Sequence, residues 1–205
     1  MNVLLINGSP HKNGCTYTAL CEVQGELEKA GVNTQLVHIG NDPVNGCTAC
    51  GGCAKTGRCV FDDAVNRMLD LADGADGFVF GSPVHYAGAA GKLVCLMDRM
   101  FYAGKNFENK PAACVVSARR SGTTAAFDQL IKYFTIRSMP VVSSNYWNGV
   151  HGFTPDDVRK DEEGMQTMRQ LGRNMAWLLQ CIEAGKKANI PLPMREEKIG
   201  THFIR

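Results

Sequence analysis

The chain has 205 residues, of which 44% are apolar and 20% are charged. This length and balance suit one globular domain with a sizeable core and exclude collagen-like, disordered and miniature disulfide-rich proteins. The 22 Lys and Arg residues against 20 Asp and Glu leave a net charge of +2, too weak a field to indicate nucleic-acid binding. No apolar run approaches the roughly 18 residues of a membrane helix, so the sequence predicts a cytoplasmic protein without nucleic-acid or membrane partners.

Strands and helices alternate along the chain. Short apolar runs predict buried strands over residues 2–7, 32–39, 77–81, 112–117 and 141–144. Apolar residues at helical spacing predict helices over residues 16–30, 64–72, 90–102, 124–137 and 161–184. This alternation predicts an α/β fold, a parallel sheet with helices on both faces and a ligand crevice at the carboxyl ends of the strands.

Two segments fall outside this alternation. Residues 40–63 are rich in Gly, Cys, Asn and Asp and are long for a connection, so we expect a functional Cys-rich insertion within a domain of residues 1–188. Residues 189–205 contain Pro191 and Pro193 near their start and cannot begin as a regular helix. This C-terminal extension is a candidate for an arm at a subunit contact.

The loop after the first strand is a candidate phosphate site. Residues 8–18 bring backbone N–H groups and hydroxyls to the positive end of a helix, which attracts anions. The loop lacks the signatures of nucleotide-hydrolysing and dinucleotide-binding turns, so a terminal monophosphate fits it better. The alternative is an ordinary strand-to-helix turn in which Ser and Thr act as caps.

Two further loops are expected at the same edge of the sheet. Residues 81–89 contain an aromatic pair among small residues, on which a flat ring can rest. Residues 117–122 add small residues and two arginines. Together the three loops offer a phosphate cup, an apolar platform and a donor-rich rim, the layout that flavin mononucleotide (FMN) requires.

Several motifs carry a family resemblance. Gly8-Ser9-Pro10, Ser82-Pro83-Val84 and the stretch from Lys92-Leu93 to Asp98-Arg99 resemble the NADPH-dependent FMN reductase group of flavodoxin-like proteins. Within that group, Cys47-x2-Cys50-x2-Cys53-x5-Cys59 resembles the compact motif of the iron–sulfur flavoproteins. The resemblance spans about residues 1–185. It implies a flavodoxin-like three-layer sandwich with five parallel strands in the order 2-1-3-4-5, bound FMN, a redox function and a homodimer or homotetramer.

The resemblance also implies the FMN-binding residues by position. The phosphate is expected at the first loop, the ring at the second and its pyrimidine end at the third. The candidates are Ser9, His11, Thr16, Tyr17 and Thr18; Pro83, Val84, His85, Tyr86 and Ala87; and Ser117, Ala118, Arg119, Arg120 and Gly122. His11 stands where the family usually has Arg, His85 where it often has Tyr and Val94 where it usually has Lys, so we expect contacts that differ in detail.

Nine cysteines are present, an odd number that, without a secretory leader, argues for reduced thiols, a metal or redox chemistry. Cys47, Cys50 and Cys53 can wrap one face of an iron–sulfur cube, and Cys59 can close it. Structural zinc usually takes two separated Cys pairs, which makes it the weaker alternative. We expect a 4Fe-4S cluster at these four cysteines. The alternatives are a zinc site, free thiols, or a disulfide formed after the cluster is lost. Four others are expected to be inert core residues: Cys21, Cys95, Cys114 and Cys181.

The leading function is an FMN-dependent oxidoreductase that passes electrons among NAD(P)H or a ferredoxin donor, FMN and the cluster. An FMN or quinone reductase without a cluster is the alternative, and a non-catalytic redox-sensing or metal-binding module is a third reading. No hydrolase or metalloprotease motif is present, and no protein residue is assigned a catalytic role. Arg119 or Arg120 is a candidate for tuning the flavin, with ordinary surface charge as the other interpretation.

Overall fold

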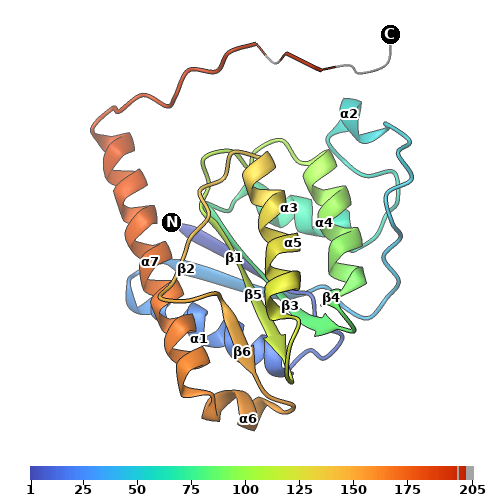
Figure 1. The fold of residues 1–205 in the computed structure, drawn as a ribbon. Helices are drawn as coiled ribbons and strands as arrows, with labels where there is room; N and C mark the ends of the chain where they lie inside the picture. Colours follow the sequence, from blue (N-terminus) through green and yellow to red (C-terminus); the bar gives the residue numbers. More distant parts are fainter. Residues whose placement is uncertain (198, 202–205) are drawn as a thin grey trace.

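The central strands form from apolar runs that are buried on both faces. The computed structural model describes residues 1–197 and 199–201. Strands β1 (Asn2–Asn7), β3 (Gly77–His85) and β5 (Ala112–Ala118) lie in the middle of the sheet, flanked by β2 (Asn33–His38) and β6 (Gly149–His151). All neighbours in the order β2-β1-β3-β5-β6 are parallel (Figure 1). The predicted parallel sheet and its 2-1-3-4-5 order are confirmed.

The third predicted strand is longer than expected and adds a sixth strand to the sheet. We expected it to end at Gly81, but β3 continues to His85 because Ser82 and Pro83 stay in register with β5. The strand then turns back through Tyr86, which has a φ of +60°, into the short antiparallel β4 (Gly88–Ala89). The expected loop is therefore a tight hairpin.

The prediction of a fifth strand over residues 141–144 is wrong. Only Val141 makes an isolated bridge to Ala112, and regular pairing begins at Gly149. The Ser144 hydroxyl bonds to the Tyr146 carbonyl and to Asn148 Oδ1, which draws the chain into a turn. A serine that bonds to nearby groups in this way competes with strand pairing.

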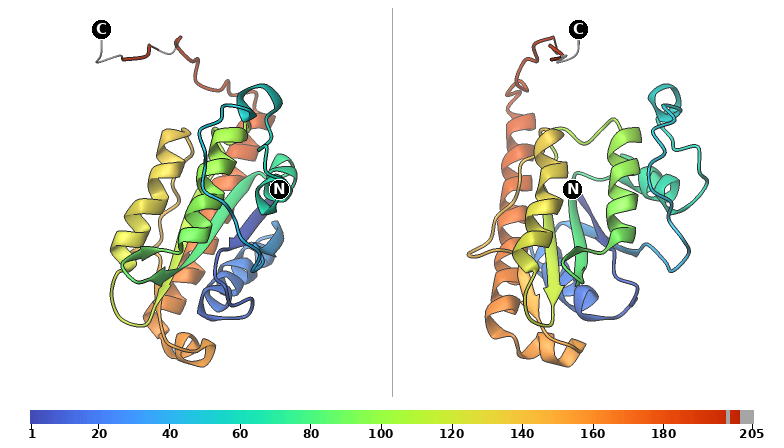
Figure 2. Two further views of the ribbon diagram at one scale, coloured as in Figure 1. Left: turned by 90° about the vertical axis from the view of Figure 1, so that its right-hand side faces the viewer. Right: turned by 45° about the vertical axis from the view of Figure 1, so that its right-hand side comes forward.

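The helices form two layers, one on each face of the sheet (Figures 1 and 2). Helices α1 (Cys15–Lys29) and α7 (Glu162–Lys187) cover one face, and α3 (Ala64–Asp73), α4 (Gly91–Ala103) and α5 (Thr123–Ile136) cover the other. All five correspond to predicted helices. Two short helices were not predicted: α2 (Cys53–Thr56) and α6 (Pro155–Lys160).

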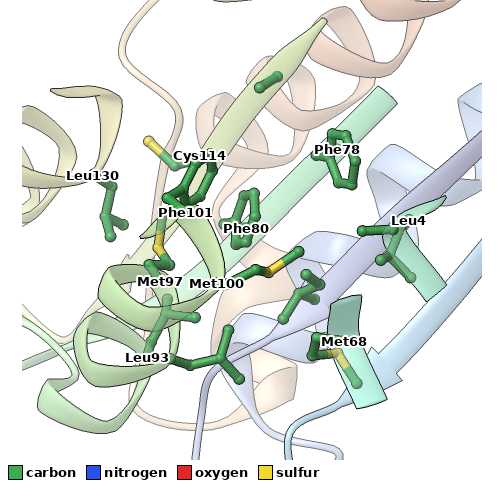
Figure 3. Close-up of a cluster of buried hydrophobic side chains, with 14 of the residues drawn as sticks. Leu4, Met68, Phe78, Phe80, Leu93, Met97, Met100, Phe101, Cys114 and Leu130 are labelled. Atoms are coloured by element: carbon green, nitrogen blue, oxygen red, sulfur yellow. The ribbon is translucent and has the colours of Figure 1, made fainter. Parts of the chain in front are cut away.

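Strand side chains alternate between the two layers, as the pleat requires. Val3 and Leu5 point toward α1 and α7, whereas Leu4 and Ile6 join the larger cluster under α3, α4 and α5. Figure 3 shows that cluster, in which Phe78, Phe80 and Met100 lie between the sheet and α4. Its Cys114 is buried, and burial raises the pKa of this thiol. The prediction of a core cysteine is correct at Cys114 and wrong at Cys181, which is exposed on α7, while Cys21 and Cys95 are half-buried.

Ion pairs connect helix α7 to α1. Glu26 is buried and pairs with Lys29 and Arg173, and Glu22 pairs with Arg169. Beyond α7, residues 189–197 run as exposed coil away from the sheet (Figure 1). Within residues 1–197 and 199–201, none of the helices combines the length and apolar character needed to span a lipid bilayer.

Candidate functional site

The carboxyl ends of β1, β3 and β5 meet at one edge of the sheet. Asn7 is in register with Gly81, and Pro83 with Ser117. The Gly8 N–H donates to the Gly81 carbonyl at 2.8 Å. The three loops that were candidates for FMN binding therefore leave the sheet next to one another.

A side chain at Gly81 would disturb this edge. A Cβ there would lie 2.7 Å from Leu20 Cδ1 and 2.8 Å from Thr16 Cγ2, both on α1. Helix α1 can approach β3 closely because Gly81 has no side chain. The first turn of α1 is thereby held beside the ends of β1 and β3.

The loop between β1 and α1 is shaped by its own polar groups. The Ser9 N–H donates to Asn7 Oδ1 at 3.0 Å, and the His11 N–H donates to Ser9 Oγ at 3.1 Å. Asn7 Nδ2 donates to the Lys12 carbonyl at 3.0 Å. Ser9 is buried, whereas His11 and Lys12 are exposed. The loop is thus a fixed turn whose two basic residues face outward.

The first turn of α1 has no side-chain cap. Its N-cap residue is Gly14, which has no side chain to accept hydrogen bonds from the first-turn N–H groups, and no acidic residue occupies the first turn. Thr16 and Thr18 instead use their hydroxyls elsewhere, which weakens the interpretation of this loop as an ordinary capped turn. Uncapped N–H groups at the positive end of a helix fit a bound phosphate.

Thr16 links the first candidate loop to the third. Its Oγ1 lies 2.8 Å from Ser117 Oγ, and the two residues are 1% and 2% exposed. Thr18 is also buried, but its hydroxyl donates to the Gly14 carbonyl at 3.2 Å within the helix. The Cys21 side chain, one turn along α1, raises the pKa of Tyr17. The structure therefore brings Ser9, Thr16 and Ser117 to the sheet edge and directs the hydroxyls of Tyr17 and Thr18 elsewhere.

The second and third loops also touch. Val84 is half-buried at the end of β3, and a Cβ on Gly122 would lie 2.9 Å from Val84 Cγ1. Gly122 has a φ of +91°, a conformation that favours glycine. His85, Tyr86 and Ala87 are exposed on the hairpin. The half-buried end of β3 and the exposed hairpin therefore lie beside the third loop.

The two arginines of the third loop are exposed. The Arg119 guanidinium lies 5.4 Å from the centre of the Phe153 ring, in a cation–π arrangement. Ala118 is buried at the end of β5. The structure thus supplies a surface contact for Arg119 while leaving the arginines at the rim of the sheet edge.

The four clustered cysteines line a single cavity. Its volume is about 320 Å³, and its walls also include Arg99 and Tyr102 from α4. Cys47 and Cys50 are exposed, and Cys53 and Cys59 are half-buried. These cysteines belong to residues 40–63, the Cys-rich segment, which lies beside α4 and away from α7 (Figure 2).

The thiols are spread around this cavity and do not converge on one point. In the part of the chain that the structure describes, no three Cys, His, Asp or Glu side chains come close enough to bind one metal ion. A four-iron cube presents its iron atoms at separate corners, so its ligands need not converge as those of zinc do. Four thiols on the wall of one cavity fit such a cube.

Arg99 belongs to a stretch that carries the family resemblance, but the sequence interpretation gave it no role beside the cysteines. It is 2% exposed and donates to the carboxylate of Asp63, to the Asn45 carbonyl and to Cys59 Sγ. The signal available in the sequence was an arginine in a helix that is otherwise apolar nearly all round. A charge in such a helix needs a buried partner.

Comparisons with known proteins agree with the resemblance. Residues 1–154 match the family described as NADPH-dependent FMN reductase. An iron–sulfur flavoprotein of Methanocaldococcus jannaschii is 31% identical over 192 residues, which cover 89% of this chain and 100% of that protein.

Solved structures share the fold. The structure of RosB with a bound formylriboflavin phosphate intermediate superposes with a TM-score of 0.70 at 13% identity, covering 100% of this chain and 94% of that one. An archaeal flavodoxin superposes with a TM-score of 0.59 at 15% identity, covering 88% of this chain and 99% of that one. The fold is flavodoxin-like, and the chain belongs to the NADPH-dependent FMN reductase family and, within it, to the iron–sulfur flavoproteins.

Proposed function

We propose that the chain is an FMN-dependent oxidoreductase that passes electrons between NAD(P)H or a ferredoxin-type donor, FMN and a 4Fe-4S cluster. The observation that carries the proposal is the sheet edge at which the Thr16–Ser117 hydrogen bond joins the first and third loops. When bound, FMN supplies hydride and electron transfer, and the cluster supplies single-electron transfer. The protein residues bind and orient these groups.

In this proposal the FMN phosphate lies against the uncapped N-terminus of α1. Ser9, the exposed His11 and the N–H groups of the first turn provide donors, and the α1 dipole favours the negative charge. The ring rests on the half-buried end of β3 and its hairpin. Its pyrimidine end faces residues 117–122, where backbone groups and the two arginines are available.

The flavin part of the proposal is tested by titrating flavin-free protein with FMN and following the quenching of flavin fluorescence. The loaded protein is then assayed for oxidation of NADH and NADPH with ferricyanide or a quinone. Saturable binding at one FMN per chain and FMN-dependent turnover are expected. Iron binding without such turnover would favour the non-catalytic module, and the absence of FMN binding would contradict the proposal.

The cysteine part of the proposal assigns the cluster to Cys47, Cys50, Cys53 and Cys59. All nine cysteines are free thiols in the structure, which agrees with a reducing, cytoplasmic location. Cys50→Ser is expected to lose the iron and acid-labile sulfide that the wild-type protein carries after anaerobic purification. Cys181→Ser is the matched control, because Cys181 is an exposed thiol on α7. FMN-loaded wild-type protein without iron would instead identify a cluster-free reductase.

The proposal extends to the C-terminal segment as an arm between copies of a homodimer or homotetramer. Ile190, Leu192 and Met194 are 67%, 70% and 96% exposed. Exposed apolar side chains on an extended segment gain stability when a partner covers them. A chain ending at residue 188 is expected to form particles with fewer copies of the chain than the full-length protein, as measured by light scattering. An unchanged number of copies per particle would contradict this role.

A further inference from the structure

Arg99 is buried, yet it stands on the face of α4 that meets the Cys-rich segment. Its side chain is 1% exposed. Nη1 and Nη2 form a fork with the two carboxylate oxygens of Asp63, at 2.6 Å and 3.0 Å. Asp63 Oδ1 also accepts from the Val65 N–H at 3.0 Å and so caps α3. The ion pair therefore connects α4 to the end of the Cys-rich segment and to the start of α3.

The same guanidinium reaches two other parts of the segment. Nη1 donates to the Asn45 carbonyl at 3.1 Å, just before the first clustered cysteine. The Phe61 ring lies over the guanidinium, 5.0 Å from its central carbon to the ring centre. One side chain of α4 thus holds both ends of the stretch that contains the four cysteines.

Arg99 also contacts one of the cysteines directly. Nε donates to Cys59 Sγ at 3.1 Å. The Cys59 backbone is fixed in addition by Asn66, whose Oδ1 accepts from the Cys59 N–H at 2.9 Å and whose Nδ2 donates to the Cys59 carbonyl at 3.0 Å. Cys47 and Cys50, by contrast, are exposed. Of these three cysteines, Cys59 is the one whose sulfur and backbone are both held in place.

We infer that Arg99 is a positioning residue that presents Cys59 to the cluster and raises the cluster's reduction potential through its N–H···S hydrogen bond. This inference rests on the proposed function. The reduced cluster carries one more negative charge than the oxidised cluster, so a donor aimed at a ligand sulfur stabilises the reduced form more. Asp63 offsets much of the guanidinium charge, which leaves the hydrogen bond as the larger contribution.

The test uses the double variant R99M/D63N in the full-length, FMN-loaded protein. Replacing both partners leaves no unpaired buried charge, and the amide oxygen that D63N introduces can still cap α3. The net charge is unchanged, but the donor to Cys59 is lost. The midpoint potential of the cluster is measured by redox titration, followed by electron paramagnetic resonance, and iron and sulfide are assayed on the same samples. We expect a lower potential than in the wild type, or a loss of iron at unchanged FMN content.

Arg58→Gln is the matched control. Arg58 is the chain neighbour of Cys59, but its side chain is 51% exposed and pairs with Asp70. Its removal deletes a charge near the cluster without touching the sulfur, and solvent screens that charge. We expect full iron content and a potential shift no more than about half of that in R99M/D63N. An equal or larger shift in R58Q would overturn the inference, because it would assign the effect to general charge.

Arg99→Lys provides a second variant in case the double variant does not fold. Lysine keeps the charge that pairs with Asp63 but has no Nε–H along its stem to reach Cys59. A lower potential in R99K supports the inference. The inference about Arg99 is overturned, and the proposed function is not, if R99K and any folded R99M/D63N carry a full cluster at the wild-type potential. Wild-type protein that carries no iron would overturn the proposed function as well.

Discussion

The two candidate cofactor regions are built in different ways. The sheet edge is made by the ends of regular strands, and its register brings Asn7, Gly81 and Ser117 together from distant parts of the chain. The Cys-rich segment has little regular structure and is held chiefly by two buried side chains, Arg99 of α4 and Asn66 of α3. A site set by strand register spreads its support over many residues, so we expect a single change there to cost less than the loss of Arg99. The following changes test that difference.

The largest effect is expected from Arg99→Met alone. It leaves the Asp63 carboxylate without its buried partner, and breaking such a pair from one side costs about 3 kcal/mol of unfolding free energy. Urea denaturation measures the loss, and hydrogen exchange is expected to rise in residues 40–63 while β1 and β5 stay protected. If hydrogen exchange rose equally in residues 40–63 and in the sheet strands, Arg99 would stabilise the whole fold and not the Cys-rich segment in particular.

Gly81→Ala is expected to have the next largest effect. The added methyl group would lie within 2.8 Å of Leu20 and Thr16, and overpacking of this kind costs about 2 kcal/mol. FMN affinity is expected to fall with it, because the first turn of α1 must shift. Gly74→Ala is the control, since a Cβ there meets nothing within 4 Å. Equal stability and FMN affinity in both variants would contradict the close approach of α1 and β3.

Thr16→Val removes the hydrogen bond that joins the first and third loops. Because this hydrogen bond holds the two loops in the FMN-binding arrangement, its loss is expected to weaken FMN binding by about 1.4 kcal/mol, which raises the Kd for FMN about tenfold in a fluorescence titration. Thr18→Val is the comparison, because the Thr18 hydroxyl donates to the Gly14 carbonyl. A larger loss of FMN affinity in Thr18→Val would assign the phosphate contact to Thr18, as the family resemblance implies.

Glu26→Gln is expected to have the smallest effect and to leave both cofactor regions unchanged. Hydrogen bonds from Lys29 and Arg173 hold the pKa of Glu26 below its usual value of 4.5. Its stabilising contribution, about 1 kcal/mol, is present above that value and is lost as the pH falls through the lowered pKa. Wild-type stability is therefore expected to fall more steeply than that of Glu26→Gln below pH 4.5. Parallel pH curves would contradict this.

Apolar pattern and alternation sufficed to predict the parallel sheet, its two helical layers and the loops at its carboxyl edge. Pattern failed where local hydrogen bonds competed with strand pairing, as at Ser144, and where β3 continued past Gly81 into a hairpin. Helix α6 was missed although Thr154 and Asp157 form a capping box around Pro155. That signal was present in the sequence.

The candidate sites, like the fold, could be predicted only in part from sequence pattern. Sequence spacing grouped the four cysteines, and the structure places all four on one cavity. Sequence spacing gave no indication that Arg99 pairs with Asp63, because 36 residues separate the two and only the packing of α4 brings them together. The assignment of Ser9, His11 and the other loop residues to FMN stays a prediction.

The most direct test of the central claim is flavin, iron and sulfide analysis of one sample purified without oxygen. The account predicts one FMN, four irons and four sulfides per chain, with flavin absorption bands over a broad iron–sulfur background. Colourless protein that binds neither added FMN nor iron under reducing conditions would contradict it.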